Sequence, residues 1–177
     1  MMSDEPEVAK KYASEGVYLL RTAQQIQYQL SQMADQKASM LLGATFVIFT
    51  ITVSQIHNMA QPVPLLILGA AAFVSALLAV IAVLPSTKAP PRAAGPANIL
   101  FFGSFTQVPE EEYVEMLLDV VSDSRTVYEA FAHDIYQNGR ILAHKKYRFL
   151  AYAYRVLLAG LVMSFLAFVV AYVGSVT

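Results

Sequence analysis

The chain contains no cysteine among its 177 residues. Disulfide bonds, zinc–thiolate sites and thiol nucleophiles are therefore excluded. Charged residues are also scarce: Asp, Glu, Lys and Arg make up 14% of the sequence, whereas ordinary soluble domains contain about 25%. Apolar residues make up 56%, and the net charge of −1 gives no indication of a nucleic-acid partner. This composition is typical of a membrane protein.

Asp, Glu, Lys and Arg are absent from three long apolar stretches, at residues 38–57, 63–84 and 156–176. Each stretch has about 20 residues, which a helix rising ~1.5 Å per residue needs to cross a ~30 Å hydrocarbon core. A buried core helix would be shorter and would show a polar face. We therefore predict an all-α membrane protein with three transmembrane helices. The polar N-terminal segment lacks a signal-peptide pattern, so the first span is expected to be an uncleaved anchor.

The basic residues predict how the protein is oriented. All twelve Lys and Arg residues either precede the first span or lie between the second and third spans. Basic residues concentrate on the cytoplasmic side of membrane proteins. We therefore expect a cytoplasmic N-terminus, a cytoplasmic loop between spans two and three, and a C-terminus outside.

Residues 1–37 predict a cytoplasmic amphipathic helix that continues into the first span. Apolar residues recur every seven positions, and smaller or apolar residues fall between them at alternating spacings of four and three. This pattern predicts a seam that packs along another helix. Lys37 takes the next seam position, either as a lysine reaching the membrane surface or as a cation that faces an anion inside the bundle. The two sets are Tyr12, Leu19, Ile26, Met33 and Met40, and Gly16, Ala23 and Leu30.

The loop between spans two and three predicts a linker at 85–108 and helices at 109–155. Pro109, followed by Glu110 to Glu112, is typical of a helix start. Asn138–Gly139 predicts the end of that helix, and a second helix is expected to start near Arg140 and feed the third span. Together with the N-terminal helix, these elements predict a cytoplasmic helical bundle. The linker contains the apolar segment ANILFFGSF (97–105), whose side chains could lie in the bundle core, at the lipid headgroups or in a ligand pocket.

The spans contain no charged side chain, which argues against proton relays and coupled transport. Small residues instead follow one another at helical spacing, which lets helix backbones approach closely in lipid. This packing could lie within one subunit or between subunits of a homo-oligomer. In the third span the small residues are Gly160, Ser164, Ala167, Ala171 and Gly174.

The sequence offers little support for catalysis. Glu129, His133 and Asp134 lie close together on a predicted helix, but a metal site needs further ligands that the sequence does not supply. A glycine-rich phosphate loop and a supported catalytic triad are also missing. We therefore expect no enzyme activity, no catalytic residue, no bound metal and no cofactor. A basic cluster with Arg140, Lys145 and Lys146 could meet anionic lipid headgroups or a phosphate-bearing ligand.

Four blocks occur in an order that resembles the transmembrane effectors of bacterial Pycsar antiphage systems. The resemblance extends from about Arg21 to Gly160, and its blocks are moderately specific as an ordered set. They are ADQKASMLLG (34–43), NILFFGSF (98–105), EEYVEML (111–117) and DIYQNGRILAHKKYRFLAYAYRVLLAG (134–160). Some members of the family also carry an N-terminal phosphohydrolase domain, for which this sequence is too short.

The resemblance implies a mode of action. In such systems a paired pyrimidine cyclase makes cyclic UMP or cyclic CMP on infection, and the effector then impairs the bacterial inner membrane, so the infected cell dies. Ligand-binding residues do not carry over from the family, and our candidates follow from position and chemistry alone. An alternative is a passive membrane adaptor whose cytoplasmic bundle docks a partner protein. The ligand candidates are Lys37, Asn98, Phe101, Phe102, Arg140, Lys145 and Lys146.

Overall fold

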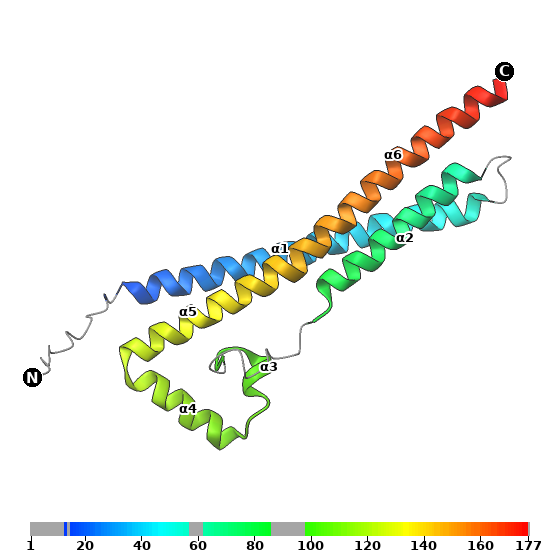
Figure 1. Ribbon diagram of the computed structural model, residues 1–177. Coiled ribbons are helices and arrows are strands. Elements are labelled where there is room, and N and C mark those ends of the chain that lie inside the picture. The colour runs from blue at the N-terminus through cyan, green and yellow to red at the C-terminus, as the bar shows by residue number, and fades with distance from the viewer. Residues whose placement is uncertain (1–12, 14, 57–61, 86–97, 177) are drawn as a thin grey trace, which may run out of the picture. The chain divides into compact units, whose positions relative to one another are not determined.

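The computed structural model describes residues 13, 15–56, 62–85 and 98–176, and every regular element in these ranges is a helix. Three helical stretches, within Gly16–Gln55, Val63–Val83 and Ser124–Ser175, are long and apolar enough to cross a membrane. The predictions of an all-α chain and of three such helices are confirmed. In chain order (Figure 1), the elements are α1 (Gly16–Gln55), α2 (Val63–Val83), α3 (Phe102–Phe105), α4 (Glu110–Ser122), α5 (Ser124–Ile141), the π-helix η3 (Leu142–Tyr147) and α6 (Arg148–Val176).

The chain divides into two compact units. Unit 1 combines the described residues up to Ile26 with residues 98–137, and unit 2 contains residues 27–56, 62–85 and 138–176. Unit 1 therefore holds the start of α1 together with α3, α4 and most of α5. Unit 2 holds the remainder of α1 together with α2, η3 and α6.

Small side chains form the core of unit 2. Ala38, Ala72 and Ala153, from α1, α2 and α6, are each fully buried. Small residues allow helix backbones to approach closely, which is how helices associate in lipid. Two hydroxyl groups add hydrogen bonds between α6 and α2: Ser75 Oγ donates to the Ala153 carbonyl over 2.8 Å, and Ser164 Oγ donates to the Pro64 carbonyl over 2.7 Å.

The face that α1 buries differs from the predicted seam. The side chains at the predicted seven-residue spacing are exposed, so they do not pack against another described helix of this chain. In unit 2 the helix instead buries a line of mostly small residues, because small side chains permit the close helix packing of that unit. Ala23 and Leu30 of the intervening set are half-buried, and Tyr12 lies outside the described residues. The exposed residues are Leu19, Ile26, Met33 and Met40, and the buried line is Ala34, Ala38, Leu41, Thr45 and Thr52.

The helix break in the second half of the chain also lies elsewhere than predicted. Helix α5 continues through Asn138 and Gly139, and the break occurs at Asp123, whose backbone is extended. A Cβ atom at Gly139 would lie 3.2 Å from Nε2 of Gln27 on α1. The glycine therefore leaves room for the side-chain amide of Gln27, and the tertiary arrangement outweighs the weak intrinsic preference of Asn–Gly for a turn.

In unit 1, α4 and α5 meet at a sharp turn (Figure 1). Pro109 occupies the N-cap position of α4, and three glutamates occupy the first turn, where the helix dipole favours negative charge. At the other end, the single hydroxyl hydrogen of Thr126 lies within reach of the carbonyls of both Val120 and Asp123. This side chain therefore offers a partner to the Val120 carbonyl at the end of α4, whereas the Asp123 carbonyl also accepts a hydrogen bond from the Val127 N–H of α5.

Candidate functional site

A buried asparagine connects the segment before α3, residues 98–101, to α5 in unit 1 through hydrogen bonds. Asn98 is only 6% exposed. Its Nδ2 donates to Asp134 Oδ1 over 3.0 Å and to Gln137 Oε1 over 3.2 Å, and its Oδ1 accepts a hydrogen bond from the Leu100 N–H over 3.0 Å. Both amide hydrogens are thus used within the chain. The Asn98 side chain, a predicted ligand contact, has a structural role in this arrangement.

Asp134 lies at the centre of the same network. Its exposed fraction is 6%, and its second carboxylate oxygen, Oδ2, accepts a hydrogen bond from Gln24 Nε2 over 2.7 Å. Gln24 belongs to α1, Asp134 to α5, and Asn98 to the segment before α3. A buried carboxylate is costly unless it is hydrogen-bonded. Asp134 therefore joins three separate parts of unit 1 through a single side chain.

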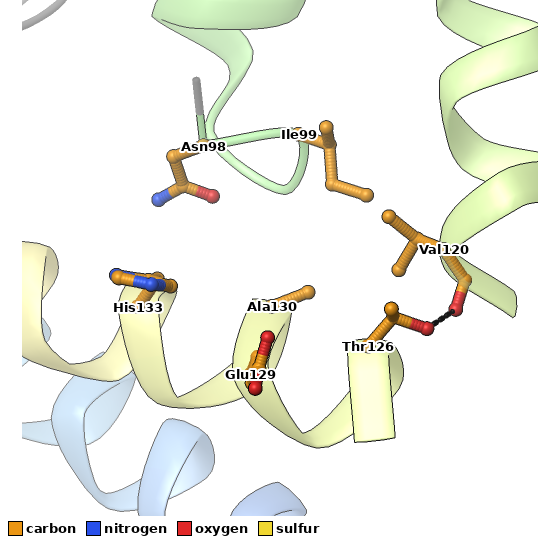
Figure 2. Close-up of a pocket in the computed structure, with 7 residues that line it drawn as sticks. All are labelled: Asn98, Ile99, Val120, Thr126, Glu129, Ala130 and His133. Carbon is orange, nitrogen blue, oxygen red and sulfur yellow. Dashed lines mark hydrogen bonds between the residues drawn. The ribbon is translucent and has the colours of Figure 1, made fainter. Parts of the chain in front are cut away.

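A pocket of about 170 Å³ lies beside this network. Figure 2 shows Asn98 and Ile99 across the pocket from the α5 side chains, with Val120 of α4 at one end. The walls combine apolar groups with the carboxylate of Glu129 and the imidazole of His133. Small-molecule pockets usually span about 300–1,000 Å³, so this pocket is small for a whole ligand. Its lining is Asn98, Ile99, Val120, Thr126, Glu129, Ala130 and His133.

The phenylalanines of the predicted apolar segment ANILFFGSF lie in unit 1. Phe101 is half-buried and packs against Phe102 with ring centroids 5.1 Å apart, while Phe102 itself is 53% exposed. Phe105 packs against Tyr113 of α4 with centroids 5.0 Å apart. Ile99 is buried. The segment thus divides its apolar side chains between the interior of unit 1 and its surface.

The four predicted cationic contacts all belong to unit 2. Lys146 Nζ lies 2.7 Å from both carboxylate oxygens of Asp35 and 2.8 Å from Ser31 Oγ, and its side chain is 20% exposed. Lys145 Nζ donates to the Leu84 carbonyl, just after α2. Both ammonium groups therefore make contacts within the chain. Lys37 and Arg140 are exposed.

The small residues of the third span lie partly against α2 of the same chain. A Cβ atom at Gly160 would overlap Ala71, and Ser164 hydrogen-bonds to Pro64. Ala167 and Ala171 are half-buried, and Gly174 is exposed with no atom within 4 Å of where its Cβ would lie. The end of this stripe nearest η3 therefore packs against α2 of the same chain.

Sequence reasoning missed several residues of unit 1. Gln24 and Gln137 were not predicted. Their amide groups meet Asp134 and Asn98 only once the chain has folded, so the sequence pattern does not reveal them. Thr126 and Val120 were also missed as pocket residues, because the turn at Asp123 that brings them together was not predicted. A signal for that turn was present in Ser122–Asp123–Ser124, whose residue types favour helix N-caps.

Comparisons with known proteins identify one family. A family model described as a Pycsar effector protein domain matches residues 18–173 of the chain. The match begins near the start of α1 and ends in α6, so it includes residues of both units and every residue that lines the pocket. No curated protein and no solved structure gives a significant match.

Proposed function

Because the chain belongs to the Pycsar effector protein family, we propose that it is a membrane effector of an antiphage system and is switched on by cyclic UMP or cyclic CMP. The family implies a cyclic nucleotide signal and a paired cyclase. The single observation that carries the proposal is the family match, which extends over residues 18–173 of 177. The three helices long and apolar enough to cross a membrane support the membrane part of the proposal.

The pocket of unit 1 is the proposed binding site for the pyrimidine base. Ile99, Val120 and Ala130 offer apolar contact to the faces of a ring. The Glu129 carboxylate can accept a hydrogen bond from an N–H group on the base edge, and the His133 imidazole has one nitrogen that donates and one that accepts when it is neutral. Oε1 of Glu129 already accepts a hydrogen bond from Arg125 Nε over 2.9 Å, so the second carboxylate oxygen is the one proposed to meet the base. The phosphodiester would remain outside the pocket.

The proposed response is a change in the population of two arrangements of the protein. A ligand shifts such an equilibrium only by its difference in affinity for the two states. Helix α1 supplies residues to both units, and the continuous run α5–η3–α6 does the same. We propose that nucleotide binding in unit 1 alters the membrane-crossing helices through these shared helices and so impairs the inner membrane.

Topology, assembly and chemistry complete the proposal. The basic residues support a cytoplasmic N-terminus and a C-terminus outside, since all twelve fall before the first span or between the second and third. The effector would act on the lipid bilayer as a homo-oligomer. It would perform no catalysis, a proposal supported by the lack of a glycine-rich phosphate loop and of a supported catalytic triad in the sequence.

The proposal is tested with the full chain in lipid nanodiscs and in vesicles. Labelled cyclic UMP and cyclic CMP are titrated against the protein, with cyclic AMP as a purine control of the same charge, and dye release from vesicles is followed in parallel. We expect one pyrimidine nucleotide to bind and to trigger dye release, while cyclic AMP does neither. Absence of binding by both pyrimidine nucleotides would overturn the proposal and favour a passive membrane adaptor.

A further inference from the structure

Helix α1 has a second face in unit 2, which is opposite to the buried one and is exposed along its length. We call this set the heptad face. Its three large apolar members, Met33, Met40 and Val47, are 42%, 72% and 55% exposed. Its other two members, Gln36 and Gly43, are uncharged and also exposed. The heptad face consists of Met33, Gln36, Met40, Gly43 and Val47.

The spacing of this face predicts a helical partner. Large apolar residues recur every seven positions, with a second residue three positions after each, as in helices that supercoil around one another. The same seven-residue spacing extends back to Ile26 and Leu19, which are exposed in unit 1. Lipid does not account for the whole repeat, because Met33 and these two residues precede Lys37, the last charged side chain before the apolar stretch.

The charges indicate which partner fits. Copies inserted into one membrane in one orientation place their α1 helices parallel, and in a parallel pair each seam residue lies opposite its own equivalent. Any charged seam residue would then face a like charge. The charged residues of α1 are Arg21, Asp35 and Lys37, and none of them is a member of the heptad face or its N-terminal continuation. Lys37, which continues the intervening set of the predicted seam four positions after Met33, borders this face. The face is therefore electrostatically compatible with itself.

Two further residues favour self-pairing. A glutamine amide both donates and accepts hydrogen bonds, so Gln36 can pair with Gln36 of a second copy. At Gly43, a Cβ atom would have no neighbour within 4 Å in this chain. A glycine on an exposed face of a membrane helix permits a second backbone to approach.

We propose that the heptad face of α1 is a parallel contact with a second copy of this chain. The contact deepens the homo-oligomer part of the proposed function, but it needs no nucleotide. The resting protein would therefore already be paired along α1, and the nucleotide would act on a preformed assembly.

Cysteine cross-linking tests the contact directly, because the natural chain contains no cysteine. Met33→Cys and Gln36→Cys are compared in membranes from cells without the cyclase, under a mild oxidant. A disulfide requires Cα atoms within about 7 Å, so both variants should form covalent dimers. Tyr28→Cys is the matched control, since Tyr28 is 65% exposed on the same helix but lies off the heptad face. It should form few dimers.

A charge variant completes the experiment. Met33→Lys in the Gln36→Cys background places like charges opposite each other and should abolish the dimer, whereas Met33→Gln should retain it. Equal cross-linking at Tyr28, Met33 and Gln36, or none at the last two, would overturn the contact and leave the face to lipid or to another protein. Nucleotide binding is measured separately on the cysteine-free chain, so failure of the contact and failure of the proposed function are distinguishable.

Discussion

Asn98 and Asp134 face each other inside unit 1, with Asn98 Nδ2 donating to Asp134 Oδ1 over 3.0 Å, and each residue is only 6% exposed. The pair joins the segment before α3 to α5 directly beside the pocket. One wall of the proposed base site is therefore positioned by a buried hydrogen bond.

Replacing Asn98 by alanine should destabilise unit 1. The variant removes a hydrogen bond to a buried carboxylate and leaves Gln137 without its amide partner, at an expected cost of about 1–3 kcal/mol. Thermal unfolding in detergent measures the change. Thr106→Ala is the control, because the Thr106 hydroxyl is exposed and bonds only within its own helical turn. Equal melting temperatures for Asn98→Ala and the natural chain would contradict the buried role of the pair.

The Lys146–Asp35 ion pair should contribute about 1 kcal/mol. The lysine side chain is 20% exposed but the aspartate is 47% exposed. The expected stabilisation is therefore between that of a surface ion pair and that of a buried charged hydrogen bond. A double-mutant cycle with Lys146→Met and Asp35→Asn measures the coupling.

The same two variants separate a structural lysine from a ligand contact. If Lys146 serves only the ion pair, both variants should change nucleotide affinity equally. A loss of affinity in Lys146→Met alone would show that the lysine contacts the phosphate instead.

Adding one methyl group at Gly160 should weaken the packing of α6 against α2. A Cβ atom there would overlap Ala71 Cβ, so the helices must separate, at a cost of about 1–3 kcal/mol, as for other overpacked cores. Resistance to unfolding in mixed micelles measures the effect of Gly160→Ala. Gly174→Ala is a matched control on the same helix, where the new methyl group meets no atom within 4 Å, and it should behave like the natural chain.

The pocket assignment makes a prediction for two histidines. His133→Ala should reduce the affinity for the pyrimidine nucleotide about tenfold, since loss of one hydrogen bond to a ligand costs roughly 1–1.5 kcal/mol. His144→Ala changes an exposed histidine of η3 in unit 2 and should leave affinity unchanged. Isothermal titration in nanodiscs provides the comparison, and an equal effect of the two substitutions would contradict the assigned pocket.

The helix content and the three helices long and apolar enough to cross a membrane could be predicted from the sequence, because long runs without charge have few other structures available. The face that α1 buries could not. Met33 and Met40 carry the stronger periodic signal, but Ala34 and Ala38 form the contact within the chain, because close packing of helices favours small residues over large ones.

The candidate site was predictable only in part. Asn98 was identified from its position, but its partner Asp134 lies 36 residues away, and the sequence gives no rule for pairing the two. Lys146 was identified from its charge, but its contact with Asp35 depends on which side of η3 faces α1 in the folded chain. Such contacts require the tertiary arrangement, which local patterns do not encode.

The π-helix η3 is the place where the chain can lose one residue without changing the direction in which its flanking helices face. Its hydrogen bonds join residues five apart instead of four, so the segment holds one residue more than an α-helix of the same register would. Deleting Ala143 should therefore restore an ordinary helix and leave both flanking helices facing as before. The same deletion within α6 would rotate every following side chain by about 100°, given 3.6 residues per turn. Natural one-residue insertions and deletions in related chains should accordingly gather at η3.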